Sequence, residues 1–270
     1  MVTWDLPVKH VNVGDICIGY MELGEGPPLV LIMGLWGTMD LWPLRFVKAM
    51  AEHRRVIMFD NRGMGETSAG RREFSYGVFC NDVAGLINAL DLRRADVLGW
   101  GMGANIALVL AQDRPDVVRH LVVYAGSCGG NECTPVAPEI QHMFDKEDLT
   151  MEDVVRSMFP KEWNIAHPDI WEYYPEPRSA TPQDRMERQL AADDGWQGCF
   201  DDLKFIRAAT LIVSGDEDLE CPKENAITLN LEIAGSKMML FHGAGHGLMY
   251  QMPEELADAI NQFLGVTRKA

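Results

Sequence analysis

Short apolar runs with no polar interruption recur along the chain, and segments with helical periodicity separate them. The runs are residues 29–33, 56–59, 97–98, 121–124, 211–213 and 238–241. Strands that are apolar at every position are typical of a parallel sheet buried on both faces by helices. The intervening helical patterns include residues 79–90, 104–111 and 253–263. Because strands alternate with helices, right-handed crossovers and a doubly wound α/β sheet are predicted.

Two further strands are predicted near the N-terminus. Residues 10–13 and 16–20 alternate between apolar and other side chains on either side of Gly14-Asp15. This pattern favours an antiparallel hairpin at the edge of the sheet. Together with the six apolar runs, the hairpin predicts a mostly parallel sheet of eight strands.

The alternation stops between residues 130 and 203. This segment is acidic, contains scattered aromatic residues and seven prolines, and shows no obvious strand pattern. We interpret it as a helical cap, inserted after the sixth strand and packed over the carboxyl ends of the strands. The predicted domains are therefore a core of residues 1–129 and 204–270 and a cap of residues 130–203.

Composition excludes several classes of function. The formal net charge of −16 argues against a nucleic-acid partner, since phosphate contacts require clustered Lys and Arg. No run approaches the length of a membrane span, and residues 1–10 lack the charged and apolar regions of a signal peptide. The six cysteines show no C-x-x-C spacing, as expected of reduced thiols. We therefore expect a cytoplasmic protein with no membrane partner. The sequence does not indicate an oligomeric state.

Three strand ends carry residues that suit catalysis. Residues 97–104 read VLGWGMGA, an apolar strand followed by a glycine-rich turn and an apolar helix, with Gly101 at its centre. Residues 211–218 form an apolar run that ends in carboxylates, and His246 lies between glycines after residues 238–241. A histidine needs a carboxylate to fix its tautomer, and strand-end loops bring such distant residues together. Asp218 is the favoured partner of His246, with Asp216 as the alternative.

These motifs resemble those of the α/β-hydrolase superfamily, in the same chain order: nucleophile turn, acid, base. The resemblance runs over nearly the whole chain apart from residues 130–203. Two further segments carry it, the loop of residues 31–37 and residues 60–67, which match D-x-R-G-x-G-x-S with Thr67 at the last position. Met33 stands where many members have His. The turn matches G-x-S-x-G with its serine replaced by Gly101.

The resemblance implies a role for each matching residue. Asp218 corresponds to the acid of the catalytic triad and His246 to its base. The backbone N–H groups of Leu35 and Met102 correspond to the donors of the oxyanion hole. Gly101 corresponds to the nucleophile but has no side chain, so covalent catalysis at this residue is excluded.

The ligand is expected to be a small hydrophobic or aromatic molecule. Aromatic and apolar residues of the cap are expected to line a pocket with Gly34, Trp36, Trp100 and Leu248, since ligand sites are mostly apolar. No metal-binding cluster or phosphate-binding loop appears in the sequence. Neither a metal nor another cofactor is therefore expected.

Three functions remain open. The first is a hydrolase of small hydrophobic esters, lactones or related acyl compounds whose serine has been lost or altered. The second is a non-covalent enzyme in which the His246–Asp218 pair acts as general base, in the manner of a lyase, decarboxylase, cyclase or cofactor-free oxygenase. The third is a ligand-binding protein without catalysis, as in the N-myc downstream-regulated family, which has glycine at the same turn.

Overall fold

One sheet of eight strands forms the centre of the protein. The computed structural model describes residues 4–175 and 177–265. The strand order is β1-β2-β4-β3-β5-β6-β7-β8, with β2 antiparallel to both of its neighbours and every pair from β4 to β8 parallel. The predicted doubly wound, mostly parallel sheet is confirmed. The strands are β1 (Lys9–Val13), β2 (Ile16–Leu23), β3 (Pro28–Ile32), β4 (Arg55–Phe59), β5 (Ala95–Trp100), β6 (Val118–Tyr124), β7 (Ala209–Gly215) and β8 (Lys237–Phe241).

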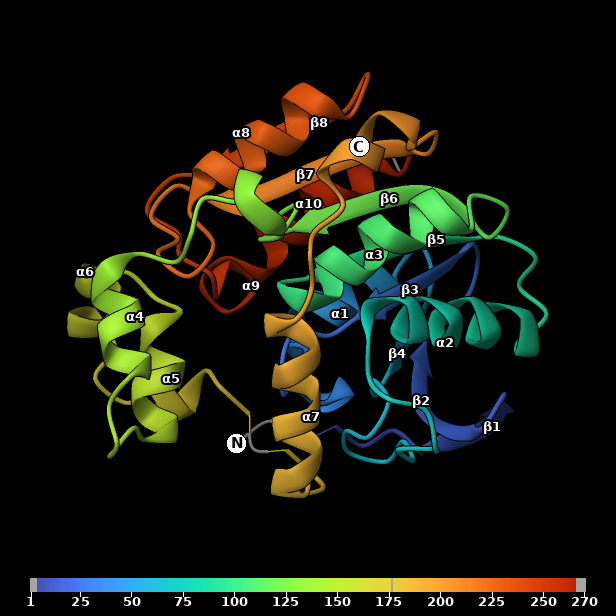
Figure 1. Cartoon of the computed structure of the whole chain (residues 1–270), viewed down its shortest axis with the longest axis horizontal. Helices are drawn as coiled ribbons and strands as arrows, with labels where there is room; N and C mark the ends of the chain where they lie inside the picture. Colours follow the sequence, from blue (N-terminus) through green and yellow to red (C-terminus); the bar gives the residue numbers. More distant parts are fainter. Residues whose placement is uncertain (1–3, 176, 266–270) are drawn as a thin grey trace.

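Helices cover both faces of the sheet. The first face packs against α2 (Tyr76–Ala89), α3 (Met102–Asp113) and α8 (Lys223–Glu232), and Figure 1 shows α2 and α3 side by side. The second face packs against α1 (Leu44–Ala51), α9 (Leu248–Gln251) and α10 (Pro253–Phe263). Strand β3 has side chains in both cores: Val30 belongs to the first and Leu31 to the second, and both are fully buried. Its uninterrupted apolar sequence follows from this double burial.

The last apolar run differs from the expectation that all six runs are buried on both faces. Strand β8 pairs only with β7 and lies at the edge of the sheet. Its Met239 and Leu240 side chains are 38% and 40% exposed. A run of apolar residues therefore predicted the strand here but not its burial.

The regular secondary structure between β6 and β7 is all helical in the described part of the chain. They are α4 (Pro138–Phe144), α5 (Met151–Ser157), α6 (Lys161–Ala166), α7 (Gln183–Asp194) and the 3₁₀ turns η2 (Gly130–Glu132), η3 (Ile170–Glu172) and η4 (Phe200–Phe205). In Figure 1, α4, α5 and α6 gather beyond one end of the sheet, and α7 stands apart from them. The domain boundaries at residues 129/130 and 203/204 stay predictions.

The remaining described helical segment, η1 (Met39–Leu41), follows β3. None of the helices within residues 4–175 and 177–265 combines the length and the apolar character needed to cross a membrane.

Candidate functional site

Gly101 occupies the turn between β5 and α3. Its backbone has φ 56° and ψ −123°, a conformation that glycine adopts without the steric cost borne by other residues. The neighbouring glycine is also required, since a Cβ on Gly103 would lie 2.2 Å from the carbonyl oxygen of Ile32. The glycine-rich sequence therefore lets the N-terminus of α3 approach β3 closely and makes the turn sharp.

The turn points position 101 at His246. A Cβ built on Gly101 would lie 3.3 Å from Nε2 and 3.7 Å from Cε1 of the His246 ring. This is the direction in which a nucleophile would need to face a general base. The geometry around position 101 thus matches a nucleophile turn, although the residue itself supplies no attacking atom.

The structure brings Asp218, and not Asp216, to His246. Oδ2 of Asp218 lies 2.9 Å from Nδ1 of His246, and both residues are buried. Oδ1 of Asp218 accepts hydrogen bonds from the backbone N–H groups of Glu220 and Cys221 at 3.0 and 2.8 Å. Asp216 instead pairs with the exposed ring of His242 at 2.8 Å. The rigid, buried Asp218 is therefore the group that can orient the His246 ring.

The backbone carbonyl of His246 holds the loop in place. It accepts hydrogen bonds from Nε1 of Trp100 at 3.1 Å and from the hydroxyl of Tyr124 at 2.6 Å. The next residue, Gly247, donates its N–H to the carbonyl of Met158 in the helical insertion at 2.8 Å. The core strands β5 and β6 and the insertion together fix the position of the imidazole.

Glu220 is a site residue that the sequence analysis missed. Its Oε2 lies 3.7 Å from Nε2 of His246, on the side of the ring away from Asp218. Its Oε1 lies 2.6 Å from the hydroxyl of Ser157, at the end of α5. The only signal in the sequence is a second carboxylate two residues after Asp218. That spacing alone does not show that the side chain turns toward the histidine.

Two carboxylates raise the pKa of His246. Burial by itself lowers the pKa of the imidazole, but the charges of Asp218 and Glu220 and the hydrogen bond to Asp218 outweigh it and raise the pKa to about 9. Burial raises the pKa of Glu220, and the nearby His246 partly opposes this rise. At neutral pH the ring is therefore an imidazolium, with Asp218 beside Nδ1 and Glu220 beside Nε2.

The backbone N–H groups of Leu35 and Met102 lie beside the same turn. Both residues line the cavity next to Gly101, and neither N–H donates to an acceptor among the described residues. The adjacent Trp36 N–H is occupied, since it donates to Oε1 of Gln189 in α7 at 2.6 Å. Leu35 and Met102 thus both lie in the cavity wall, and their role as oxyanion-hole donors stays a prediction.

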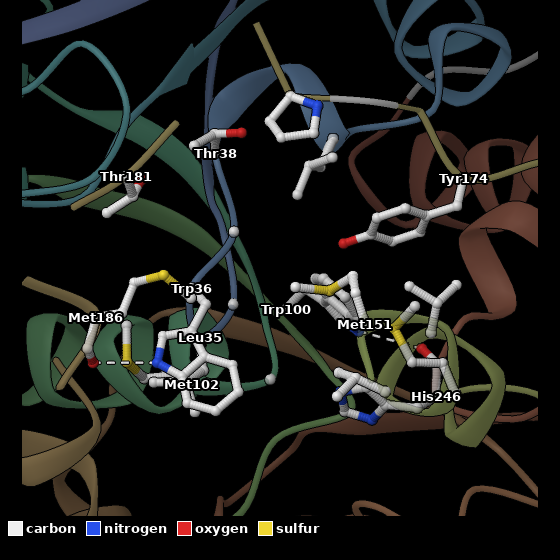
Figure 2. Close-up of a pocket in the computed structure, with 18 of the residues that line it drawn as sticks. Leu35, Trp36, Thr38, Trp100, Met102, Met151, Tyr174, Thr181, Met186 and His246 are labelled. Atoms are coloured by element: carbon white, nitrogen blue, oxygen red, sulfur yellow. Dashed lines mark hydrogen bonds between the residues drawn. The ribbon is translucent and has the colours of Figure 1, made fainter. Parts of the chain in front are cut away.

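A cavity of about 590 Å³ opens in front of these groups. Figure 2 shows Trp36 and Met102 on one side, His246 on another, and the hydroxyl of Tyr174 pointing inward. Among the described residues in its wall, Glu220 and His246 are the only ones with charged side chains. The other lining residues are Gly34, Leu35, Gly37, Thr38, Leu41, Trp100, Gly101, Phe144, Met151, Val154, Val155, Met158, Trp171, Pro175, Pro177, Ser179, Thr181 and Met186.

Three of the four residues predicted to bind substrate lie in this wall, namely Gly34, Trp36 and Trp100. Leu248 differs from the prediction and does not line the cavity. It is the first residue of α9, and its fully buried side chain packs in the core on the second face of the sheet. In the described residues, no group of three or more His, Cys, Asp and Glu side chains could hold a metal ion.

Comparisons with known proteins agree with this geometry. The family model described as alpha/beta hydrolase fold matches residues 27–162. A 2-hydroxy-6-oxo-2,4-heptadienoate hydrolase from Pseudomonas putida is 26% identical, with 95% of each chain covered. A hydrolase from Pseudomonas aeruginosa superposes with a TM-score of 0.81 at 23% identity, covering 96% of this chain and 98% of that one. The enol-lactonase from Burkholderia xenovorans superposes with a TM-score of 0.81 at 20% identity, covering 96% of this chain and 100% of that one.

A catalytic-type turn, a paired histidine and an apolar cavity thus lie at the carboxyl ends of a doubly wound sheet. Together with the family match, they place the chain in the α/β hydrolase fold family.

Proposed function

We propose that this chain is an altered hydrolase that binds a small hydrophobic ester, lactone or related acyl compound. The observation that carries the proposal is the geometry at Gly101, where a Cβ would lie 3.3 Å from Nε2 of a histidine already paired with Asp218. The base, the acid and two free backbone donors accompany a turn that lacks only the attacking atom.

The cavity supports this class of ligand. Its volume of about 590 Å³ falls within the range of small-molecule sites, and its wall is dominated by aromatic, aliphatic and methionine side chains. The relatives described above include a hydrolase of a dienoate and an enol-lactonase, which act on acyl compounds by name. A hydrophobic acyl group in the cavity and a carbonyl oxygen at the Leu35 and Met102 N–H groups would fit these features.

Restoring the hydroxyl tests the proposal. The variant Gly101→Ser should hydrolyse p-nitrophenyl butyrate about 10³-fold or more faster than the Gly101 protein, since the serine supplies the missing covalent step. The rate is followed by the release of p-nitrophenolate at a saturating concentration of the ester. Because serine at φ 56° carries strain of about 1–3 kcal/mol, the variant should also melt at a lower temperature.

The control is the same pair of proteins with His246→Ala. This change should remove the gain in rate of Gly101→Ser, because the serine then has no base. A folded Gly101→Ser protein, checked by circular dichroism, that shows no gain in rate would contradict the proposal.

A second candidate is a non-covalent enzyme that uses His246 directly on a bound molecule or on water. The observation that favours it is Glu220, which lies 3.7 Å from the imidazole nitrogen that faces the cavity. The same four proteins distinguish the candidates. Turnover by the Gly101 protein of a compound that is neither an ester nor a lactone, abolished by His246→Ala, would support the non-covalent enzyme.

A further inference from the structure

Glu220 lies in the cavity wall beside His246. It has no role in the triad of position 101, His246 and Asp218 described above. We propose that Glu220 is a catalytic base of this chain, which takes a proton from water while His246 serves as the acid. The inference rests on the proposed function, in that the cavity must bind an acyl compound. It adds a second acid–base pair, Glu220–His246, to the pair formed by His246 and Asp218.

The geometry places the three components around one atom. Nε2 of His246 lies 3.7 Å from Oε2 of Glu220 and 3.3 Å from the point where a side chain at position 101 would begin. All three residues line the same cavity. Because Gly101 has no side chain, the space beside Nε2 can hold a water molecule, and Glu220 lines the same cavity. A base in this position can reach the proton directly or through one water.

Glu220 is also held in a fixed orientation. The hydroxyl of Ser157, 2.6 Å from Oε1, fixes one carboxylate oxygen and leaves Oε2 toward the histidine. The backbone N–H of Glu220 donates to Oδ1 of Asp218 at 3.0 Å. These contacts hold the base, the acid and the orienting carboxylate in a fixed arrangement, as preorganised proton transfer requires.

Two acidic side chains face the His246 ring and favour its charged form. Asp218 and Glu220 are the charged groups that face the His246 ring. The hydroxyl of Tyr124 donates to the backbone carbonyl of His246, and Tyr174 lies in the cavity wall. With a pKa of about 9, His246 is protonated at neutral pH and cannot accept a proton from water. Burial raises the pKa of Glu220, which makes its carboxylate a stronger base than an exposed glutamate.

The proposed step is hydrolysis by direct attack of water. An O–H bond of water breaks and its proton passes to Glu220, while the oxygen forms a bond to the carbonyl carbon. The carbonyl electron pair moves to the carbonyl oxygen, which the N–H groups of Leu35 and Met102 would stabilise. When the intermediate collapses, the bond to the leaving oxygen breaks, and that oxygen takes the proton from Nε2 of His246. Transfer of the proton from Glu220 to Nε2 restores the pair, with one water consumed.

The test compares Glu220→Gln in two backgrounds, with p-nitrophenyl butyrate at pH 7.5. In the Gly101 protein, this change should lower the rate about 100-fold or more, since a general base typically contributes 10²–10⁴-fold. In Gly101→Ser, the same change should raise the rate, because loss of the Glu220 charge leaves more His246 neutral for the serine. Opposite effects in the two backgrounds are not expected of a merely structural residue.

Glutamine keeps the size of the side chain and its contact with Ser157, so the variant should fold. Glu217→Gln is the matched control, because Glu217 is an exposed carboxylate on the same loop and lies outside the cavity wall. It should change neither rate.

Three results would overturn the inference. The first is a Gly101 protein that hydrolyses the ester no faster than buffer does. The second is a Glu220→Gln change that leaves the rate of the Gly101 protein intact. The third is a Glu220→Gln change that lowers the rates of the Gly101 protein and of Gly101→Ser equally. Failure of the proposed function is recognised separately, since it appears as Gly101→Ser without any gain. The titration of His246, followed by NMR, provides a second measurement, and its midpoint should fall when Glu220 is replaced by Gln.

Discussion

The residue at position 101 decides which chemistry the site can perform, yet its neighbours decide the shape of the site. The turn conformation at φ 56° and ψ −123° is strained for serine and relaxed for glycine. The imidazole of His246 remains aligned with the direction of the absent side chain. The positions of Asp218, His246 and the surrounding backbone therefore do not depend on a side chain at position 101.

The raised pKa of His246 makes a prediction about the pH dependence of Gly101→Ser. The serine needs a neutral imidazole as its base, and the pKa is raised from 6.5 to about 9 by Asp218 and Glu220. The rate kcat/KM should therefore rise about tenfold per pH unit above pH 7 and level off near pH 9. The measurement is a pH–rate profile from pH 6 to 10, with the Gly101 protein subtracted at each pH.

Glu220→Gln in the same background should move the midpoint of this profile to lower pH, because it removes one of the two charges that stabilise the imidazolium. Glu217→Gln should leave the midpoint unchanged. A midpoint near 6.5 that does not respond to the loss of Glu220 would contradict the assigned electrostatics.

At the scale of elements, helix α7 holds the loop that follows β3. Trp36 has φ 60°, which is rare for a residue with a large side chain, and surrounding contacts must maintain it. Its backbone N–H donates to Oε1 of Gln189, and its indole Nε1 donates to the carbonyl of Met186 at 3.1 Å. Both acceptors belong to α7, and Figure 2 shows the indole bond at the cavity wall. The helical insertion thus fixes the backbone beside the Leu35 N–H.

Gln189→Met is therefore expected to loosen this loop. Methionine has a similar length but accepts no strong hydrogen bond, so the N–H of Trp36 is left unpaired. The cost should be about 1–3 kcal/mol in the free energy of unfolding, measured by urea denaturation. In the Gly101→Ser background, kcat for p-nitrophenyl butyrate should also fall, since the Leu35 donor moves with Trp36.

Gln183→Met provides the comparison on the same helix, because Gln183 is exposed and its side chain donates a hydrogen bond to the exposed Glu187. It should change stability by a few tenths of a kcal/mol at most. Equal effects of the two changes would show that Gln189 has no special role in holding the loop.

The sequence predicted elements better than contacts between them. Six apolar runs and the alternating pattern of residues 10–13 and 16–20 located the eight strands, because local patterns report local structure. The motifs at the strand ends located Gly101, Asp218 and His246. Leu248 was misplaced because burial in a core and exposure to a cavity give the same apolar sequence. Glu220 and Gln189 were missed for another reason. Gln189 bonds a residue 153 positions away, and no local pattern reports such a contact.

At the scale of the whole molecule, strand β5 connects the candidate site at one of its ends with a cluster of ion pairs at the other. Gly101 follows its carboxyl end, and Asp96 lies near its start, where it is fully buried. Asp96 pairs with Arg54, which is also buried, with Arg119 at 2.6 Å, and with the ring of His120 at 2.7 Å. This cluster ties β5 to β4 and β6 at the end of the sheet opposite the cavity.

Replacement of Asp96 should therefore separate stability from activity. Asp96→Asn leaves the buried Arg54 without its carboxylate and should lower the free energy of unfolding by about 3–5 kcal/mol. Asp116→Asn breaks an exposed pair with Arg114 and should cost no more than about 1 kcal/mol. Both are measured by urea denaturation. In the Gly101→Ser background at 25 °C, the kcat of each folded variant should stay within about twofold of the kcat of Gly101→Ser. The reason is that the effects of substitutions at distant sites are usually independent. A large loss of kcat in a folded Asp96→Asn protein would show instead that the two ends of β5 are coupled.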